Sequence, residues 1–170
     1  MPSRGSAHFD LIALLEVLDA EHVEYIVVGG VAATLHGSPR MTFDLDIVPE
    51  ASMVNAERLA RALGRIRAVV RDPARRALPL TMDLLIATMR SPQGGQLRLG
   101  TDSGPIDILW TLHDGRGYAE LRRHSVTRSD DERSILVVDI PELVAIKRAA
   151  GRPQDLLDVQ TLEAILERTR

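Results

Sequence analysis

Cysteine and long hydrophobic runs are both absent from this sequence of 170 residues. The absence of cysteine excludes disulfide bonds and thiolate metal sites, and it is typical of a cytoplasmic protein. No segment approaches the roughly 18 uninterrupted apolar residues that a membrane-spanning helix requires, so we expect no membrane partner. Residues 1–6 are followed by an amphipathic stretch that acidic residues interrupt, which is not the pattern of a secretory signal.

Aromatic residues and net charge are also low. Two phenylalanines, two tyrosines and one tryptophan leave few side chains on which nucleic-acid bases could stack. The net charge of −3 gives no overall attraction to nucleic acid. Hydrophobic residues make up 45% of the chain and charged residues 26%, which is typical of a globular domain. We expect one domain over residues 1–170, and the composition does not fix an oligomeric state.

Lysine is nearly absent as well. Of the 21 basic residues, only Lys147 is a lysine. A bias toward arginine codons accounts for most of this pattern. Under such a bias, the remaining lysine is either incidental or marks a position that needs a compact ammonium group and not a planar guanidinium.

Hydrophobic periodicity and turn signals predict alternating helices and strands. Ser52 is expected to cap one helix, and Gly151 is expected to end another. Residues 69–79 show only an irregular, basic pattern. The order of the helices and strands expected in the rest of the chain predicts an α/β fold with a mixed β-sheet and helices packed mainly on one face. Helices are expected at residues 9–20, 31–36, 53–67, 81–89, 117–124, 141–150 and 155–168, and strands at 24–30, 41–48, 96–99, 105–110, 125–128 and 135–139.

The strand expected at residues 41–48 carries two aspartates. Strict alternation places Phe43, Leu45 and Ile47 on the face that packs against helices. Asp44 and Asp46 then share the other face, with roughly 7 Å between their Cα atoms. Carboxylates this close repel each other, and aspartate is a poor strand former. A hard divalent cation would offset the repulsion, whereas a merely solvated strand face is the alternative.

A third acidic residue occurs in a similar setting. Asp107 interrupts the apolar strand PIDILW, residues 105–110, and lies opposite Ile106 and Ile108. If the two acidic strands are neighbours, three carboxylates meet on one face of the sheet. Such a cluster can hold two metal ions about 3.5–4 Å apart for phosphoryl chemistry.

Gly29 and Gly30 stand between a strand and a short helix. Free backbone N–H groups and the helix dipole at such a junction attract phosphate, and glycine permits close approach of the backbone. An ordinary strand-to-helix turn is the alternative interpretation.

Together, these motifs resemble the DNA polymerase beta nucleotidyltransferase superfamily. The residues that carry the resemblance are Gly29-Gly30, Arg40, Thr42, Asp44-Leu-Asp46 and Ile106-Asp107-Ile108. The segments VVGGVAATLHGSPRMTFDLDIV (27–48) and ELVAIKRAAGRPQDLLDV (142–159) are similar to motifs of its small bacterial members. These include the type IV toxin (AbiEii-like) nucleotidyltransferases. The resemblance covers about residues 10–165.

The resemblance implies a minimal nucleotidyltransferase fold that moves NMP from an NTP, such as ATP, to an acceptor. Asp44 and Asp46 would bind two Mg²⁺ ions, or Mn²⁺. Asp107 would bind the metal of the attacking group and assist its deprotonation. Lys147 would neutralise triphosphate charge and completes the implied catalytic set.

Nucleotide binding would involve both ends of the chain. The glycine pair would hold the β- and γ-phosphates, and the later motif lies in a C-terminal helical part, residues 139–170. Asp155 would be the acid of that motif, with Asp158 as a rival for the role. The implied nucleotide-binding residues are Gly29, Gly30, Arg40, Thr42, Lys147, Arg152 and Asp155.

One departure from the superfamily pattern concerns the phosphate turn. Many members have Gly-Ser there, whereas this chain has Gly-Gly followed by Val31, which removes a hydroxyl donor. The acceptor is undefined, because no large appended domain accompanies the motifs. RNA such as a tRNA end, modified by the toxin of a toxin–antitoxin system with a cognate antitoxin, is one hypothesis. Small-molecule or protein modification, or a catalytically silent binding or antitoxin protein, are the alternatives.

Other basic and polar residues have weaker assignments. Arg40 is expected to contact phosphate or to pair with Asp44, and His36 is expected to be a packed or capping residue. Residues 58–76 contain seven arginines, among which Arg58, Arg61 and Arg65 share one helix face. We interpret that face as solvated, with binding of an RNA backbone as the alternative.

Overall fold

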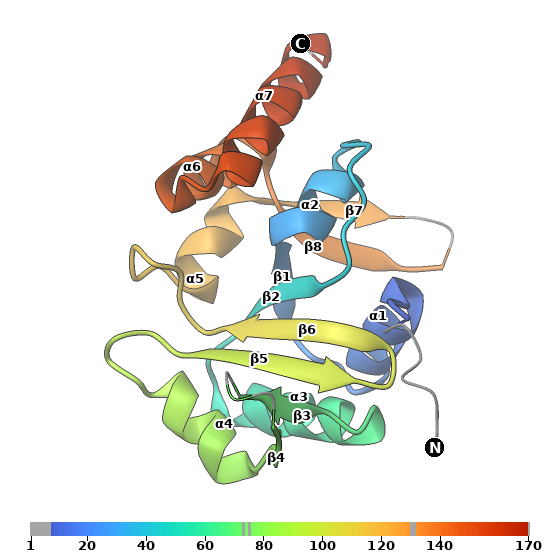
Figure 1. Cartoon of the computed structure of the whole chain (residues 1–170), viewed down its shortest axis with the longest axis vertical. Coiled ribbons are helices and arrows are strands. Elements are labelled where there is room, and N and C mark those ends of the chain that lie inside the picture. Colours follow the sequence, from blue (N-terminus) through green and yellow to red (C-terminus); the bar gives the residue numbers. More distant parts are fainter. Residues whose placement is uncertain (1–7, 73, 75, 130–131, 170) are drawn as a thin grey trace.

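The computed structural model describes residues 8–72, 74, 76–129 and 132–169. Residues 1–6 and positions 130 and 131 of the turn expected between two C-terminal strands lie outside this range. Within it, eight strands form one mixed sheet (Figure 1). Their order is β4 (Ala77–Pro79), β3 (Val69–Arg71), β5 (Gln96–Thr101), β6 (Gly104–Leu109), β2 (Leu45–Pro49), β1 (Tyr25–Val28), β8 (Ser134–Val138) and β7 (Ser125–Ser129).

The centre of the sheet brings distant parts of the sequence together. Strand β2 pairs with β1 in antiparallel and with β6 in parallel orientation. Strand β1 also pairs in parallel with β8. The parallel pairing of β2 with β6 sets Asp46 directly beside Asp107. The remaining neighbours, β6 with β5, β5 with β3, β3 with β4 and β8 with β7, are antiparallel.

Four of the helices begin at a residue whose side chain caps the first turn. They are α1 (Leu11–Ala20), α3 (Met53–Arg65), α4 (Met82–Met89) and α6 (Ile140–Ala150), capped by Asp10, Ser52, Thr81 and Asp139. Each of these oxygens accepts a hydrogen bond from a free backbone N–H of the first turn. The cap predicted at Ser52 is therefore confirmed.

The other helices are α2 (Gly29–Leu35), α5 (Tyr118–Leu121) with a 3₁₀ turn at Arg122–His124, and α7 (Pro153–Arg168). Helix α2 packs on β1, β2 and β8 and also contacts α6. Helices α6 and α7 pack against each other at one end of the molecule (Figure 1). Gly151 ends α6 with a φ of 66°, a left-handed conformation that suits glycine, as predicted.

The two faces of the central strands differ sharply. Leu45, Ile47, Ile106 and Ile108 are fully buried in the hydrophobic core. Their neighbours along the strands, including Asp46 and Asp107, point to the opposite face. The α/β class and the mixed sheet are thus confirmed. In the described part of the chain, no helix has the length and apolar character needed to cross a bilayer.

The structure corrects three local predictions. Residues 69–79, expected to be irregular, contain the short strands β3 and β4, because β3 pairs with the edge of β5 and β4 then pairs with β3. The strand expected at 41–48 begins only at Leu45, so Phe43 is 64% exposed and does not join the core. Helix α2 begins at Gly29 and not at Val31, because Gly29 itself turns the chain with a φ of 68°.

Candidate active site

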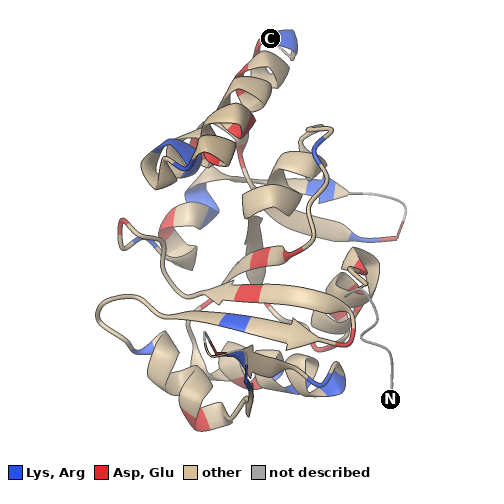
Figure 2. Cartoon of the chain, in the orientation of Figure 1, with Lys and Arg blue, Asp and Glu red and all other residues tan. Residues whose placement is uncertain are grey.

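Three aspartates at the centre of the sheet form the acidic row, defined as Asp44, Asp46 and Asp107. Asp46 and Asp107 are register partners on parallel strands, and Asp44 precedes β2 by one residue. Figure 2 shows acidic positions side by side on β2 and β6. Alternation along the two strands therefore predicted the shared face correctly.

Nearby cations compensate the negative charge of the acidic row only in part. Burial, and then the charges of Asp44 and Asp107, raise the pKa of Asp46 to about 7. Burial also raises the pKa of Asp107, with Asp44 adding to the effect and Arg98 and Arg71 opposing it. With a pKa of about 7, the Asp46 carboxyl group is partly protonated near neutral pH unless a cation offsets the repulsion.

The glycine pair lies against this row. A Cβ atom on Gly29 would stand 2.1 Å from Oδ2 of Asp46, and one on Gly30 would stand 2.6 Å from Oγ1 of Thr42. Both distances are shorter than real Cβ contacts. Glycine is required most clearly at Gly29, which also has a φ of 68°, because the start of α2 lies directly against Asp46 of the acidic row.

Thr42 and Asp44 are linked on the open side of the row. The Thr42 hydroxyl donates a hydrogen bond to Oδ1 of Asp44 at 3.1 Å. Within the described residues, no group of three or more histidine, cysteine, aspartate or glutamate side chains is arranged to hold a metal ion. The three aspartates are thus neighbours with oxygen donors suited to a hard cation, but their carboxylates do not converge on one point.

A second group of charges, the buried charge network, joins α6, α7 and the chain before β2. It consists of Lys147, Asp155, Asp158, Arg40 and Arg152. Lys147 is only 5% exposed, and its Nζ lies 2.6 Å from Oδ2 of Asp158 and 3.8 Å from Oδ1 of Asp155. Both aspartates are 3% exposed. The lone lysine is therefore a buried ion-pair partner and not a solvent-facing residue.

Two arginines complete the buried charge network. Nε and Nη2 of Arg40 lie 2.8 and 2.9 Å from the Asp158 carboxylate, and Nε and Nη2 of Arg152 lie 2.6 and 3.2 Å from that of Asp155. Arg40 was expected to contact phosphate or to pair with Asp44; in the structure its carboxylate partner is Asp158. Asp155 and Asp158 are both partners of Lys147, which explains why sequence could not separate them.

The network faces the acidic row. Lys147 and Arg152 lower the pKa of Asp46, although burial and the neighbouring aspartates outweigh them. A hydrogen bond from Arg152 to Asp155, with smaller contributions from Asp46 and Asp44, raises the pKa of Arg152. The side chain of Arg152 is 77% exposed and that of Arg40 is 39% exposed. These two guanidinium groups thus present positive charge to solvent beside the carboxylates.

His36 has a structural position, as expected. It caps the end of α2 and is 7% exposed. Its Nε2 lies 2.7 Å from the carbonyl oxygen of Val138, and its Nδ1 lies 2.9 Å from Nη2 of Arg128. Nε2–H therefore donates to the carbonyl, and Nδ1 accepts from the guanidinium. Burial lowers the pKa of His36, which is consistent with this neutral ring.

The arginine strip, defined as Arg58, Arg61 and Arg65, lies away from the acidic row. Arg61 and Arg65 share Glu21, at 3.0 and 3.1 Å, and Arg58 lies 3.7 Å from Glu24. Hydrogen bonds from Arg61 and Arg65 lower the pKa of Glu21. These contacts favour the interpretation of the strip as an ordinary polar helix face.

Sequence reasoning missed two residues beside Asp107. Arg98 is the register partner of Asp107 on β5, and its Nε lies 3.8 Å from Oδ2 of Asp107. Arg71 on β3 also acts on the pKa of Asp107. Arg98 could have been found, because it alternates with the apolar residues Leu97 and Leu99. Arg71 could not, because β3 has no clear pattern of its own.

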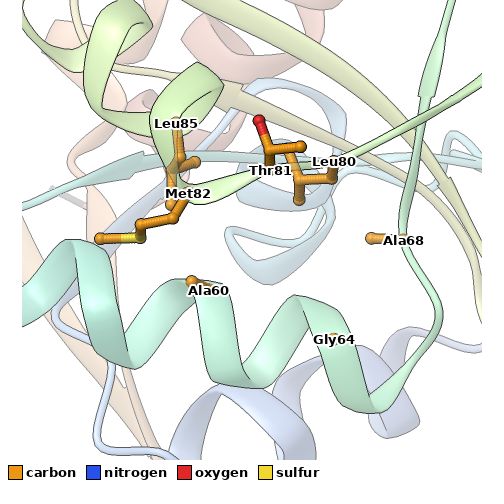
Figure 3. A pocket seen from close by; sticks show the side chains of 7 residues that line it. All are labelled: Ala60, Gly64, Ala68, Leu80, Thr81, Met82 and Leu85. Atoms are coloured by element: carbon orange, nitrogen blue, oxygen red, sulfur yellow. The ribbon is translucent and has the colours of Figure 1, made fainter.

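A small pocket lies elsewhere, between α3 and α4 (Figure 3). No titratable side chain lines it, so it offers no chemistry to the acidic row. The lining residues are Ala60, Gly64, Ala68, Leu80, Thr81, Met82 and Leu85.

Comparison with known proteins identifies the fold. No protein-family model and no curated protein sequence matches the chain. Among solved structures, the lincomycin-bound lincosamide antibiotic adenylyltransferase LnuA superposes with a TM-score of 0.61 at 17% identity, over 93% of this chain and 99% of that one. A Thermotoga maritima protein assigned as a nucleotidyltransferase superposes with a TM-score of 0.54 at 17% identity, over 95% of this chain and 97% of its own. The chain therefore has the nucleotidyltransferase fold.

Proposed function

We propose that this chain is a metal-dependent nucleotidyltransferase that moves NMP from an NTP to an acceptor hydroxyl. The observation that carries the proposal is the acidic row itself. Asp46 and Asp107 stand in register on neighbouring parallel strands, at the point where the glycine pair crosses the sheet. A carboxylate pair that nearby cations compensate only in part is costly for the fold, and it is expected where a metal ion binds.

The chemistry of the donors fits Mg²⁺ or Mn²⁺. The acidic row offers only carboxylate oxygens, and burial and the neighbouring aspartates raise the pKa of Asp46 more than Lys147 and Arg152 lower it. Asp44, Asp46 and Asp107 are the residues that would hold two such ions. Bound ions of this kind polarise the phosphate under attack and promote ionisation of the attacking hydroxyl.

The residues of the chain then have distinct roles. The Asp107 carboxylate accepts the proton of the acceptor hydroxyl, as its raised pKa favours. A bond forms between the acceptor oxygen and the α-phosphorus, the bond from this phosphorus to the β-phosphate breaks, and pyrophosphate leaves. Backbone N–H groups of Gly29 and Gly30 bind the β- and γ-phosphates.

The buried charge network supplies positive charge to the same site. Arg40 and Arg152, which are partly exposed, contact the triphosphate directly. Lys147 is buried and adds a fixed positive charge to the site. Asp155 and Asp158 hold Lys147, Arg40 and Arg152 in place through their ion pairs. Thr42 orients the Asp44 carboxylate through the hydrogen bond described above.

The acceptor is the second part of the proposal. We favour RNA, such as a tRNA end, with the chain acting as the toxin of a toxin–antitoxin pair in the cytoplasm. The second candidate is a small hydroxylated molecule, because the structural neighbour LnuA is an adenylyltransferase of lincosamide antibiotics. A catalytically silent binding protein or antitoxin is disfavoured by the acidic row, since such a protein gains nothing from mutually repelling carboxylates.

The test is incubation of the chain with each of the four labelled NTPs and Mg²⁺, in the presence of total RNA, total protein or a small-molecule extract. We expect labelled RNA with the wild-type chain, and no labelling after removal of Mg²⁺ or with the Asp46→Asn variant. Label in the small-molecule fraction alone would favour the second acceptor. No Mg²⁺-dependent label in any fraction would contradict the transferase proposal.

A further inference from the structure

Charged side chains continue across the sheet beyond Asp107. Asp46 pairs with Asp107, and Asp107 pairs with Arg98. Strand β3 pairs with β5 through Val69 with Gly100 and Val70 with Leu99. Continuing that register places Arg71 beside Arg98. One transverse line of the sheet therefore changes from acidic to basic over β2, β6, β5 and β3, and Figure 2 shows the acidic and basic positions in adjacent strands.

The basic part of this line is open to solvent. We call Arg98, Arg71 and Arg76 the basic row. The side chain of Arg98 is 70% exposed, and its contact with Asp107 is long at 3.8 Å. Arg71 is exposed, and no ion pair or hydrogen bond of its side chain occurs among the described residues. Its Cγ and Cδ lie across Gly100, each 3.6 Å from where a Cβ of that glycine would be.

A surface hollow adjoins the basic row. Val69, Arg71, Asp72, Arg76 and Ala77 line it. Arg76 pairs with Asp72 at 3.2 Å, but its side chain is still 73% exposed. The hollow and the open sheet face thus form one surface that begins at Asp107 and carries three exposed guanidinium groups.

The arginine strip on α3 makes a useful contrast. Arg61 and Arg65 share the carboxylate of Glu21, and Arg58 lies near Glu24. The basic row has fewer partners, although it stands next to the acidic row. Exposed, weakly paired arginines beside carboxylates are positioned to bind an anion that approaches those carboxylates.

We propose that the basic row binds the phosphate backbone of a single-stranded RNA whose terminal hydroxyl lies at Asp107. The proposal rests on the proposed transferase function and assigns its acceptor surface. Strands lie about 4.8 Å apart, so Arg98 and Arg71 stand roughly 5 and 10 Å from Asp107. This spread suits several consecutive phosphates, whereas a small phosphorylated acceptor would engage only one or two of the cations.

The mode of recognition follows from the side chains of this surface. Arginines bind phosphate oxygens without reading base identity. The surface carries no aromatic residue among those named, so base stacking does not contribute. Binding should therefore depend strongly on salt and weakly on RNA sequence.

The experiment compares two double variants that each remove two exposed arginines. Arg71→Gln with Arg98→Gln alters the basic row, and Arg61→Gln with Arg65→Gln, whose side chains are each 57% exposed, is the matched control on the arginine strip. Binding of a fluorescent single-stranded RNA is measured by anisotropy at several KCl concentrations with constant Mg²⁺. Binding of ATP is measured by calorimetry, and circular dichroism verifies that both variants are folded.

We expect the basic-row variant to bind RNA roughly tenfold more weakly and to lose about 1.4 units of salt slope, because each phosphate contact to a single strand contributes about 0.7. The control variant should bind RNA like the wild type, and ATP affinity should change much less than RNA affinity. Unchanged RNA binding by the basic-row variant, or an equal loss in the control, would overturn the proposal. Competition by a mononucleotide at the same molar concentration as RNA would overturn it too, in favour of a small phosphorylated acceptor.

The result is separable from the test of the transferase itself, because RNA binding is measured without transfer. A chain that binds RNA through the basic row but transfers no nucleotide contradicts the transferase proposal alone. A chain that transfers nucleotide to another acceptor and binds RNA equally well without the basic row contradicts the present inference alone.

Discussion

The acidic row and the buried charge network each contain an aspartate that is at least partly buried, but the pKa of that aspartate is raised in the acidic row and lowered in the network. In the acidic row, burial and neighbouring aspartates raise the pKa of Asp46 to about 7. In the network, burial also acts to raise the pKa of Asp155, yet the hydrogen bond and charge of Arg152 and the charge of Lys147 bring it below its usual value. Each aspartate of the network has two cationic partners within 4 Å, whereas in the acidic row, among the described residues, only Asp107 has one, at 3.8 Å from Arg98.

This difference distinguishes the network, which we interpret as part of the structural framework, from the acidic row, which we interpret as the reactive site. Ion pairs that are complete within the chain need no ligand, and they fix α6 and α7 against the chain before β2. Carboxylates that repel each other lower the stability of the fold, and a bound cation removes that cost. Removing a carboxylate from the acidic row should therefore retain or raise stability, whereas removing the central lysine of the network should lower it.

The largest effect is expected for Asp46→Asn. Loss of a metal-binding carboxylate should lower kcat by at least about a thousandfold, or about 4 kcal/mol, while the fold is retained or slightly stabilised. Steady-state transfer and thermal unfolding measure the two effects. Asp102→Asn is the control, because Asp102 pairs with Arg67 at the surface and not in the acidic row. Normal transfer by the Asp46 variant would remove the metal assignment.

The next largest effect is expected for Lys147→Met. Removing the cation leaves two buried aspartates short of a partner, which should lower the free energy of unfolding by about 3–5 kcal/mol. The neighbouring Arg148→Met is the matched control, because Arg148 pairs with Glu163 at the surface and should cost about 1 kcal/mol or less. Denaturant titration compares them. Equal losses would mean that Lys147 is no more structural than a surface residue.

A smaller effect concerns pH. Asp46 has a higher pKa in the folded chain than in the unfolded one, so the folded state holds more protons between about pH 4 and pH 7. Its contribution to stability therefore falls as the pH rises through that window. The melting temperature of Asp46→Asn minus that of the wild type should grow by a few degrees from pH 4 to pH 7 without divalent cations. Mg²⁺ at pH 7 should reduce this difference, whereas a difference independent of pH would contradict the raised pKa.

The smallest effect on stability is expected for Arg152→Gln. This guanidinium is mostly exposed, and Asp155 keeps Lys147 as a neighbour, so unfolding should change by about 1 kcal/mol or less. The KM for NTP should nevertheless rise roughly tenfold, because one charged contact to phosphate is lost. A stability loss as large as that of Lys147→Met, with KM unchanged, would contradict this prediction and would mean that Arg152 has only a structural role.

Local patterns in the sequence were sufficient for much of the fold and of the acidic row. Alternation identified the shared face of Asp46 and Asp107, because a strand allows its side chains only two directions. Ser52 and Gly151 could be assigned because capping depends on a few consecutive residues. The short strands β3 and β4 could not be predicted, since they are three residues each and depend on pairing with β5.

The partners of the charged residues were beyond local reasoning. Arg40 and Asp158 are 118 positions apart, so their ion pair exists only once α7 has packed. The pairing of Arg61 with Glu21 spans 40 positions in the same way. The choice between Asp155 and Asp158 had no answer in sequence, because one turn of α7 places both beside Lys147. Charge patterns thus indicated where ions gather, but not which of them are already neutralised.

The most direct test of the account is calorimetric titration of non-hydrolysable NTP analogues into the wild-type chain and into Asp46→Asn, each with and without Mg²⁺. If the acidic row is the metal–nucleotide site, the wild type binds at least one analogue only when Mg²⁺ is present, and the variant loses this binding while remaining folded. Binding that is equally tight without Mg²⁺, or unchanged in Asp46→Asn, would contradict the account.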